Sequence, residues 1–394
     1  MINETMYGLG SAPSVIRELF AYGLQRKAEI GEENVFDFSI GNPSVPAPEK
    51  VARVIKQLAD EPAAQLHAYS QSSGLDSVKS AIADNLNRRF GTNYSFENFY
   101  LTHGASSCLS ACFSGLANPG DEIIVIAPHF PDYRVWIEHA GAKCVAVLAR
   151  EDNFQIDIEA LKASITDHTK AVVINSPNNP VGVVYTRETL EALANLLREE
   201  QEKRGHEIYL ISDEPYRELV YDGIEVPWVP SLYENTIICY SWSKSLSLPG
   251  DRIGYVLVPD SVTDSKKVYL AISGAGRALG YICAPVFFQR VIAECVDEPA
   301  NVSAYAHNRA LLTEGLSKLG YKYVSPDGAF YLWVKALEDD AHAFSEKAKK
   351  HELLLVPSDS FGVPGWVRIG YCVSAETIEN SLPAFAALKA DYEG

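Results

Sequence analysis

Three apolar runs in the middle of the chain each lead into polar side chains, and this repeated pattern limits the possible folds most strongly. The runs are residues 171–174, 208–211 and 236–240, and the polar residues after them are Asn179, then Asp213 and Tyr216, then Lys244. Short runs rich in Val and Ile are typical of buried strands. A helical pattern over residues 187–204 separates two of them, with Thr186 as its cap and Gly205 after it. Strands that alternate with helices predict an α/β fold with a mostly parallel sheet covered on both faces.

The polar residues after these strands are expected to share one crevice, because the carboxyl ends of parallel strands meet at the same edge of a sheet. An amine, a carboxylate, an amide and a phenol would meet there, together with Arg252, eight residues after Lys244. This set fits a pyridoxal phosphate site, where a lysine forms a Schiff base, an aspartate pairs with the ring nitrogen, and cationic and hydroxyl groups hold the phosphate. Lys244 alone would more often be a solvated loop lysine, so the prediction depends on all three segments together.

The order and spacing of these segments resemble the fold-type I pyridoxal phosphate-dependent aminotransferases of class I/II, the aspartate aminotransferase-like group, from Gly41 to Arg368. The resemblance implies a large domain with a mostly parallel sheet of the seven-stranded type, and a smaller α+β domain. The expected divisions are an N-terminal arm with part of the small domain (1–45), the large cofactor-binding domain (46–290) and the small C-terminal domain (291–394). It also implies a homodimer with shared active sites.

The same resemblance assigns roles to individual residues. The catalytic residues would be Lys244, Asp213 and Tyr216. The residues that contact the cofactor would be Lys244, Gly104, Ala105, Ser106, Phe130, Asn179, Asp213, Tyr216, Ser241, Ser243, Arg252 and, across a subunit boundary, Tyr69. The substrate would meet Gly41, Asn179 and Arg368.

Several of these residues also have a purely structural interpretation. Phe130 is expected to stack on the cofactor ring, with Tyr133 as the second candidate and a plain core aromatic as the alternative. Ser106 could cap a helix as well as bind phosphate at the helix N-terminus. Arg368 lies in an apolar strand, where an unpaired charge is costly, so it either faces water at a sheet edge or binds a substrate carboxylate with its planar guanidinium.

Two further segments are interpreted from local pattern. Residues 36–40 alternate in polarity and are expected to form a short strand that ends in a turn at Gly41. Residues 271–288 are expected to form a long connection toward the second domain. The glycine pairs at 8 and 10 and at 274 and 276 lack the strand–turn–helix context of a dinucleotide-binding site.

Composition excludes several other functions. The net charge of −17 argues against a nucleic-acid-binding surface, which needs a basic excess. Seven cysteines without a Cys-x-x-Cys pair favour free thiols in a reducing cytoplasm, and nine histidines without ligand spacing predict no metal site. The first residues lack the features of a signal peptide, and no apolar run approaches the ~20 residues of a membrane span.

The predicted activity is transfer of an amino group from an L-amino acid, with aspartate as the first candidate, to a 2-oxo acid such as 2-oxoglutarate by a ping-pong mechanism. Arg277 could bind the distal carboxylate of a dicarboxylic substrate, or it could be an ordinary surface arginine. The alternatives are a carbon–sulfur β-lyase, which uses the same cofactor, and an aminotransferase for aromatic or neutral amino acids. A DNA-binding regulator built on this fold is disfavoured by the acidic composition.

Overall fold

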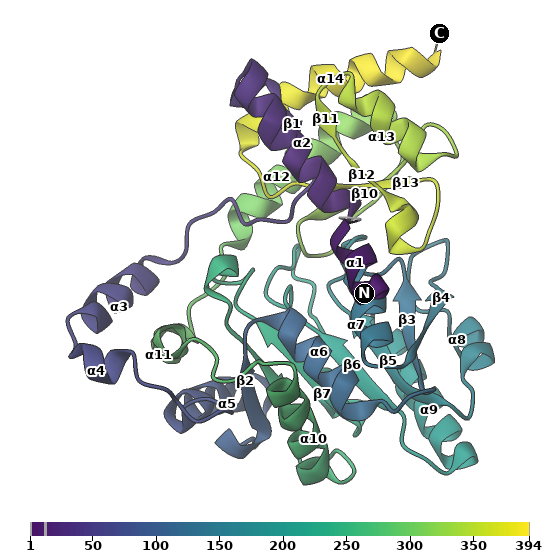
Figure 1. Ribbon diagram of the computed structural model, residues 1–394. Helices are drawn as coiled ribbons and strands as arrows, with labels where there is room; N and C mark the ends of the chain where they lie inside the picture. The colour runs from purple at the N-terminus through teal and green to yellow at the C-terminus, as the bar shows by residue number, and fades with distance from the viewer. Residues whose placement is uncertain (1, 12–13, 394) are drawn as a thin grey trace.

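A seven-stranded sheet crosses the lower part of the molecule in Figure 1. The computed structural model describes residues 2–11 and 14–393. In chain order the strands are β2 (Phe99–Thr102), β3 (Glu122–Ala127), β4 (Lys143–Leu148), β5 (Thr169–Asn175), β6 (Tyr209–Asp213), β7 (Thr236–Ser241) and β8 (Gly254–Leu257). Their order across the sheet is β2-β8-β7-β6-β5-β3-β4. Strand β8 is antiparallel to both of its neighbours, whereas the four other pairs are parallel. The predicted mostly parallel sheet is confirmed.

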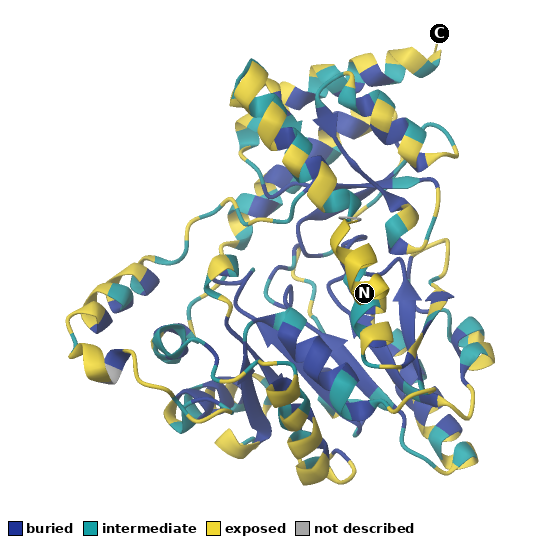
Figure 2. Cartoon of the chain, viewed as in Figure 1, coloured by how far each residue is buried: buried dark blue, intermediate teal, exposed yellow. Residues whose placement is uncertain are grey.

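Helices cover both faces of this sheet, so its strands are apolar on both sides. One face carries α6 (Ala105–Leu116), α7 (Asp132–His139) and α10 (Ser265–Ala278), and the other carries α5 (Asp76–Phe90), α8 (Ile158–Ser164), α9 (Arg187–Arg204) and α11 (Val286–Cys295). Along β3, Ile123 and Val125 pack into the first core, while Ile124 and Ile126 pack into the second. Figure 2 shows the strands buried and the outer sides of the helices exposed. This burial on both faces explains the continuous apolar runs in the sequence.

A smaller α+β unit lies above the large sheet in Figure 1. Its four-stranded antiparallel sheet has the order β12-β13-β10-β9. The strands are β9 (Tyr323–Val324), β10 (Tyr331–Lys335), β12 (Val356–Pro357) and β13 (Trp366–Gly370), and the helices are α12 (Val302–Lys318), α13 (Ala341–Lys349) and α14 (Ala375–Glu393). A two-stranded parallel pair, β1 (Phe36–Asp37) with β11 (Leu353–Leu354), attaches the N-terminal segment to this unit. The segment includes α2 (Val15–Ile30).

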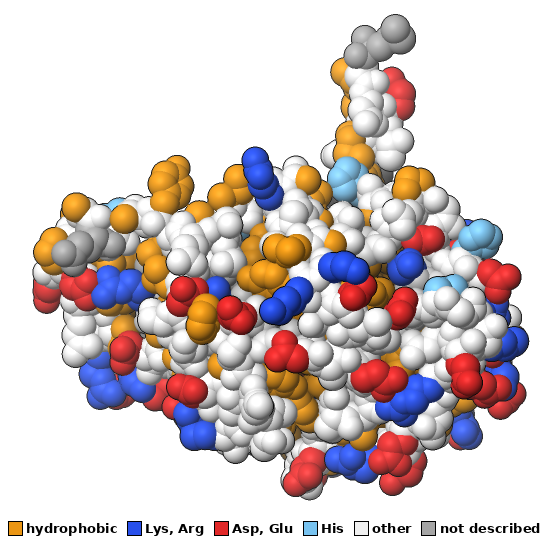
Figure 3. All heavy atoms as spheres, turned by 90° about the horizontal axis from the view of Figure 1, so that it is seen from below, with side chains coloured by type: hydrophobic (Ala, Val, Ile, Leu, Met, Phe, Trp, Pro, Cys, Tyr) orange, Lys and Arg blue, Asp and Glu red, His pale blue; other side chains and the backbone are white. Residues whose placement is uncertain are grey.

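The N-terminal helix α1 (Glu4–Ser11) has no buried residue. It is exposed in Figure 2, and it stands out from the body in Figure 3, where the molecule is viewed from below. Its apolar side chains Met6, Tyr7 and Leu9 are 43%, 60% and 47% exposed. The face in Figure 3 carries acidic and basic side chains interspersed with one another. The helices α3 (Glu49–Ala59) and α4 (Ala63–Leu66) lie at the edge of the molecule. Among the described residues, no helix combines the length and apolar character that a membrane span requires.

Candidate active site

One cavity of about 290 Å³ lies at the carboxyl edge of the large sheet, where that edge faces the smaller unit. Its wall contains most of the residues singled out from the sequence: Gly41, Ala105, Ser106, Phe130, Asn179, Asp213, Tyr216, Ser241, Ser243, Lys244, Arg252 and Arg368. They come from the ends of β6 and β7, from the segments that follow β1, β3, β5, β6 and β7, from the turn before β8, from the start of α6, and from β13 of the smaller unit. Distant parts of the chain therefore meet at the crevice that the strand pattern predicts.

Asp213, the last residue of β6, is buried and has one unused bonding position. Its Oδ2 accepts a hydrogen bond from the Tyr133 hydroxyl at 2.5 Å and one from Asn175 Nδ2 at 3.4 Å. Its Oδ1 has no hydrogen-bond partner among the described residues. Burial raises the pKa of this carboxyl to about 7, and the bond from Tyr133 opposes the rise. A buried carboxylate oxygen of this kind suits a cationic ring N–H group, which would satisfy it.

Lys244 follows β7 in a tight turn, and its half-buried side chain lines the cavity. The ammonium donates a hydrogen bond to the carbonyl oxygen of Gly41 at 2.6 Å. Burial lowers the pKa of Lys244 to about 8, and the positive charges of Arg368 and Arg252 lower it further. A lysine with a pKa near neutrality is available as a neutral amine, which nucleophilic and proton-transfer chemistry requires.

Arg368 lies in the middle of β13 and is buried, so its charge depends on specific partners. Its Nη1 donates to Asn179 Oδ1 at 3.1 Å and its Nη2 donates to the Ser39 carbonyl oxygen at 2.6 Å. Its Nε has no acceptor among the described residues. This placement excludes the alternative of an arginine facing water at a sheet edge. A guanidinium with a free donor in a cavity suits a carboxylate ligand.

The start of α6 brings groups that suit an anion to one corner of the cavity. Arg252 Nη2 donates to Ser106 Oγ at 3.3 Å, and its Nη1 donates to the Pro249 carbonyl oxygen at 2.7 Å. Gly104, just before the helix, has a φ of +89°, and a Cβ there would lie 2.8 Å from Arg252 Nη2. The free N–H groups of the helix N-terminus, a hydroxyl and a guanidinium together form a phosphate-binding arrangement.

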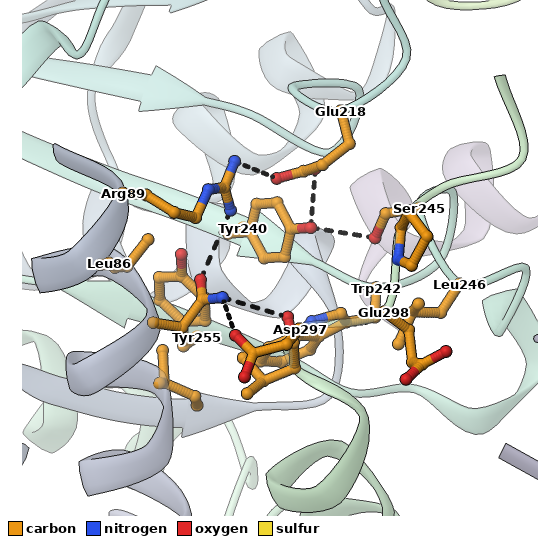
Figure 4. Close-up of a pocket in the computed structure, with 14 residues that line it drawn as sticks. Leu86, Arg89, Glu218, Tyr240, Trp242, Ser245, Leu246, Tyr255, Asp297 and Glu298 are labelled. Carbon is orange, nitrogen blue, oxygen red and sulfur yellow. Dashed lines mark hydrogen bonds and ion pairs between the residues drawn. The ribbon is translucent and has the colours of Figure 1, made fainter. Parts of the chain in front are cut away.

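A polar network next to the Lys244 turn surrounds a second cavity of about 290 Å³ (Figure 4). Trp242 and Ser245, on either side of Lys244 in sequence, line this cavity. The Tyr240 hydroxyl donates to Glu218 Oε2 at 2.8 Å and lies 2.9 Å from Ser245 Oγ. Glu218 Oε1 accepts from Arg89 Nη2 at 3.0 Å. On the far side, Asn85 Nδ2 donates to Asp297 Oδ1 at 2.7 Å. The turn is thus connected to α5 and to the segment that joins α11 to α12.

Four residues named from the sequence are not part of the wall of the first cavity: Gly104, Tyr133, Tyr69 and Arg277. Gly104 lies directly beside Arg252 of the wall, and Tyr133 donates to Asp213 of the wall. Tyr69 is 94% exposed, and Arg277 is exposed on α10. Neither lines the cavity of its own subunit.

Sequence reasoning missed Asn175 and Tyr331, which line the cavity, and it did not place Tyr133 against Asp213. Asn175 ends β5 just as Asp213 ends β6, so the strand-end pattern contained a signal for it. Tyr331 begins an apolar strand beside Phe330, and nothing local separates it from a core aromatic.

A sequence model of the family described as aminotransferase class I and II matches residues 33–385. The chain belongs to this family. It is therefore an aminotransferase, and aminotransferases of this family use pyridoxal phosphate as cofactor. The aspartate aminotransferase of Thermotoga maritima is 32% identical over 354 residues, which are 89% of this chain and 90% of the relative. The aspartate/prephenate aminotransferase of Thermus thermophilus is 31% identical over 88% of this chain and 89% of its own.

Solved structures of aminotransferases share the whole fold. An amino transferase from Eubacterium rectale has 53% sequence identity and a TM-score of 0.97 over 100% of both chains. The Thermus thermophilus aspartate aminotransferase solved with maleate has 28% identity and a TM-score of 0.87, covering 98% of this chain and 99% of that one. The predicted family, fold class and cofactor are confirmed.

The residues of the cavity fit pyridoxal phosphate. The unpaired Asp213 Oδ1 can accept from the ring nitrogen, the Lys244 amine can form the covalent link, and Ser106 with Arg252 can hold the phosphate. Phe130 lines the cavity, whereas the hydroxyl of Tyr133 is engaged by Asp213. This difference favours Phe130 over Tyr133 as the ring that stacks on the cofactor.

Proposed function

We propose that this aminotransferase moves the amino group of an L-amino acid, with aspartate as the first candidate, to a 2-oxo acid such as 2-oxoglutarate. The observation that carries the proposal is that two buried residues lining one cavity, Asp213 and Arg368, each have a polar atom without a partner among the described residues, Oδ1 and Nε. The first suits the cofactor ring and the second suits the α-carboxylate of an amino acid. The Lys244 amine lies in the same cavity.

Each residue then has a defined task. Arg368 and Asn179 bind the α-carboxylate and so orient the bond from the α-carbon to its hydrogen. Lys244 takes the proton from the α-carbon and holds it on its amine, whose pKa burial lowers to about 8. Asp213 holds a proton at the ring nitrogen, and Tyr216 donates to the ring's phenolic oxygen. Bound pyridoxal phosphate supplies the electron sink that stabilises negative charge at the α-carbon. In a ping-pong scheme the first 2-oxo acid leaves before the second binds.

Two observations bear on which amino acid is preferred. The curated relatives include aspartate aminotransferases, and a Thermus thermophilus structure was solved with maleate, a dicarboxylate. These favour aspartate, and the exposed Arg277 would contact the distal carboxylate from a neighbouring subunit. The apolar side chains in the cavity wall argue against this preference; they include Ile16, Phe130 and Trp136. They favour aromatic or neutral amino acids as the second candidate, and one relative is an aromatic-amino-acid aminotransferase of Thermococcus litoralis with 28% identity.

The test is an absorbance spectrum of the cofactor-loaded enzyme before and after addition of L-aspartate, and then of 2-oxoglutarate. We expect aspartate to shift the cofactor band and 2-oxoglutarate to restore it. L-Tyrosine and L-phenylalanine are run in parallel. A faster shift with either of these would move the preference to aromatic substrates. An amino acid with a β-thiolate leaving group tests the alternative of a β-lyase. If this substrate releases pyruvate and ammonia, and no turnover depends on a 2-oxo acid, the proposed transaminase activity is wrong and the enzyme is a β-lyase.

The enzyme is further proposed to act as a homodimer in a reducing compartment such as the cytoplasm. Helix α1 has no contact that buries any of its residues, and Tyr69 is 94% exposed although the family resemblance places it at a cofactor. A second copy of the chain would cover α1 and receive Tyr69 at its own cavity. The seven cysteines are free, which a reducing environment would favour.

A further inference from the structure

Tyr331 is a buried phenol at the centre of the active site, and none of the roles above includes it. It is 2% exposed and is the first residue of β10 in the smaller unit. Its hydroxyl lies 3.1 Å from the hydroxyl of Tyr216, which belongs to the loop after β6 in the large unit. The guanidinium of Arg368 stands 4.5 Å from the centre of its ring. One side chain therefore contacts both the group expected at the cofactor's phenolic oxygen and the group expected at the substrate carboxylate.

The Tyr331 hydroxyl lies against the backbone of Gly41, where the lack of a side chain leaves room for it. A Cβ added to Gly41 would fall 1.9 Å from the Tyr331 hydroxyl oxygen and 2.8 Å from Cζ, a separation that real atoms do not reach. The carbonyl oxygen of Gly41 is also the acceptor for the Lys244 ammonium. The glycine at residue 41 therefore provides the space in which the Tyr331 hydroxyl lies, next to the acceptor of Lys244.

We propose that Tyr331 is a positioning residue that orients the Tyr216 hydroxyl toward the cofactor and couples it to carboxylate binding at Arg368. This inference rests on the proposed function, because it assumes that Tyr216 donates to the cofactor and that Arg368 binds the substrate. A phenol has one proton to donate. If Tyr216 uses its proton toward the cofactor, its oxygen must accept from Tyr331. Tyr331 then strengthens Tyr216 as a donor, since hydrogen bonds in a chain polarise one another.

Either hydroxyl of this pair can act as the donor. Burial raises the pKa of Tyr331, and burial together with Tyr331 raises the pKa of Tyr216 well above its usual range. Both hydroxyls are therefore protonated at neutral pH and able to donate. The hydrogen bond between Tyr331 and Tyr216 also joins the smaller unit to the large one. A carboxylate that moves Arg368 would move the ring against which the guanidinium packs, and so would alter the hydrogen bond to Tyr216.

The test compares Tyr331→Phe with the wild-type holoenzyme by a pH titration of the cofactor's visible absorbance. Loss of the bond weakens Tyr216 as a donor to an anionic oxygen, so the deprotonated form of the chromophore is less stabilised. We expect the midpoint to rise by about half a unit to one unit, the shift that one hydrogen bond supports. The control is Tyr321→Phe, which removes a buried phenol bond to the Phe385 carbonyl oxygen in the same core, away from the cavity. It should lower the melting temperature and leave the midpoint unchanged.

A second readout uses maleate and 3-phenylpropanoate, carboxylates that carry no amino group. In the wild type, a saturating carboxylate neutralises Arg368 and should raise the midpoint. In Tyr331→Phe this increase should be smaller. Equal midpoints and equal carboxylate effects in the two proteins would overturn the inference while the proposed function stands. A wild-type enzyme whose absorbance responds to neither pH nor amino acid would instead defeat the proposed function.

Discussion

Single residues in this site are constrained by the atoms next to them, and Gly41 shows this most clearly. Its neighbours are the Tyr331 hydroxyl, the Phe330 ring and, through its carbonyl oxygen, Lys244. Gly41→Ala should raise KM for the amino acid by about 5- to 150-fold, because overpacking of a filled site costs about 1–3 kcal/mol. The measurement is steady-state kinetics with the cofactor absorbance as a check on loading. In the Tyr331→Phe background the same change should cost less, since the nearest atom is gone. An equal loss in both backgrounds would show that the hydroxyl does not restrict residue 41.

The sequence singles out residues whose chemistry is unusual for their position. Lys244, Asp213 and Arg368 are charged side chains at the ends or in the middle of apolar strands, and the structure brings all three to one cavity. Tyr331 could not be found in this way, because an aromatic residue in an apolar strand is ordinary. Its role depends on the position of Tyr216, more than one hundred residues away in sequence.

Among the elements, the turn that holds Lys244 is supported by the side chains around the second cavity. Tyr240→Phe removes the hydroxyl that joins Glu218 to Ser245 and leaves a carboxylate oxygen without its donor. We expect a loss of about 1–3 kcal/mol in the free energy of unfolding and a lower kcat. Denaturant unfolding and steady-state kinetics measure the two effects. The matched control is Arg88→Ala, which removes the exposed end of the same network at Asp297 and should change stability little. A Tyr240→Phe enzyme as stable as this control would contradict the supporting role.

The strand-helix alternation could be predicted from the sequence, but two element boundaries could not. The strand expected over residues 36–40 ends at Asp37, because Asp37 Oδ1 binds the N–H of Ser39 and turns the chain. The first part of the connection expected over residues 271–288 is helical, because α10 extends to Ala278. The glycines of α10 weaken the helical pattern in the sequence. Gly276 is required there because a Cβ would lie 2.1 Å from the Tyr100 hydroxyl oxygen. Such close packing depends on the tertiary neighbour and is not visible in the local sequence.

At the scale of the whole molecule, the stability of the cofactor-free protein should depend on pH through Asp213. Its pKa rises from an ordinary value of 3.8 to about 7 on folding, so the folded state binds more protons than the unfolded chain between these values. Stability therefore falls as pH rises through this window. Lys244, whose pKa falls from 10.5 to about 8, acts only at higher pH and with the opposite sign. In Asp213→Asn, the melting temperature should fall less between pH 4 and pH 7. A decline as steep as in the wild type would assign the effect to other groups.

The proposed dimer can be tested by mixing two impaired variants. Lys244→Ala lacks the amine of its own site, and Tyr69→Ala lacks the group expected at the partner's site. In a mixed dimer, one site has Lys244 from one chain and Tyr69 from the other, and is complete. Mixing and refolding should restore about a quarter of the wild-type activity per chain, because half of the dimers are mixed and half of their sites are intact. Activity that never exceeds the average of the two variants would argue that Tyr69 acts within its own subunit or not at all.

Borohydride reduction of the cofactor-loaded enzyme, followed by peptide mass spectrometry, identifies the lysine that binds the cofactor. Reduction makes the link between the cofactor and its lysine permanent. The account predicts a phosphopyridoxyl group on the peptide that contains Lys244, and no such group in Lys244→Ala. Lys79 is also buried, at 3% exposure, but it pairs with Asp76 at 2.9 Å outside the cavity and should remain unlabelled. A label on Lys79 or another lysine, or no label at all, would contradict the assignment of this cavity as the active site.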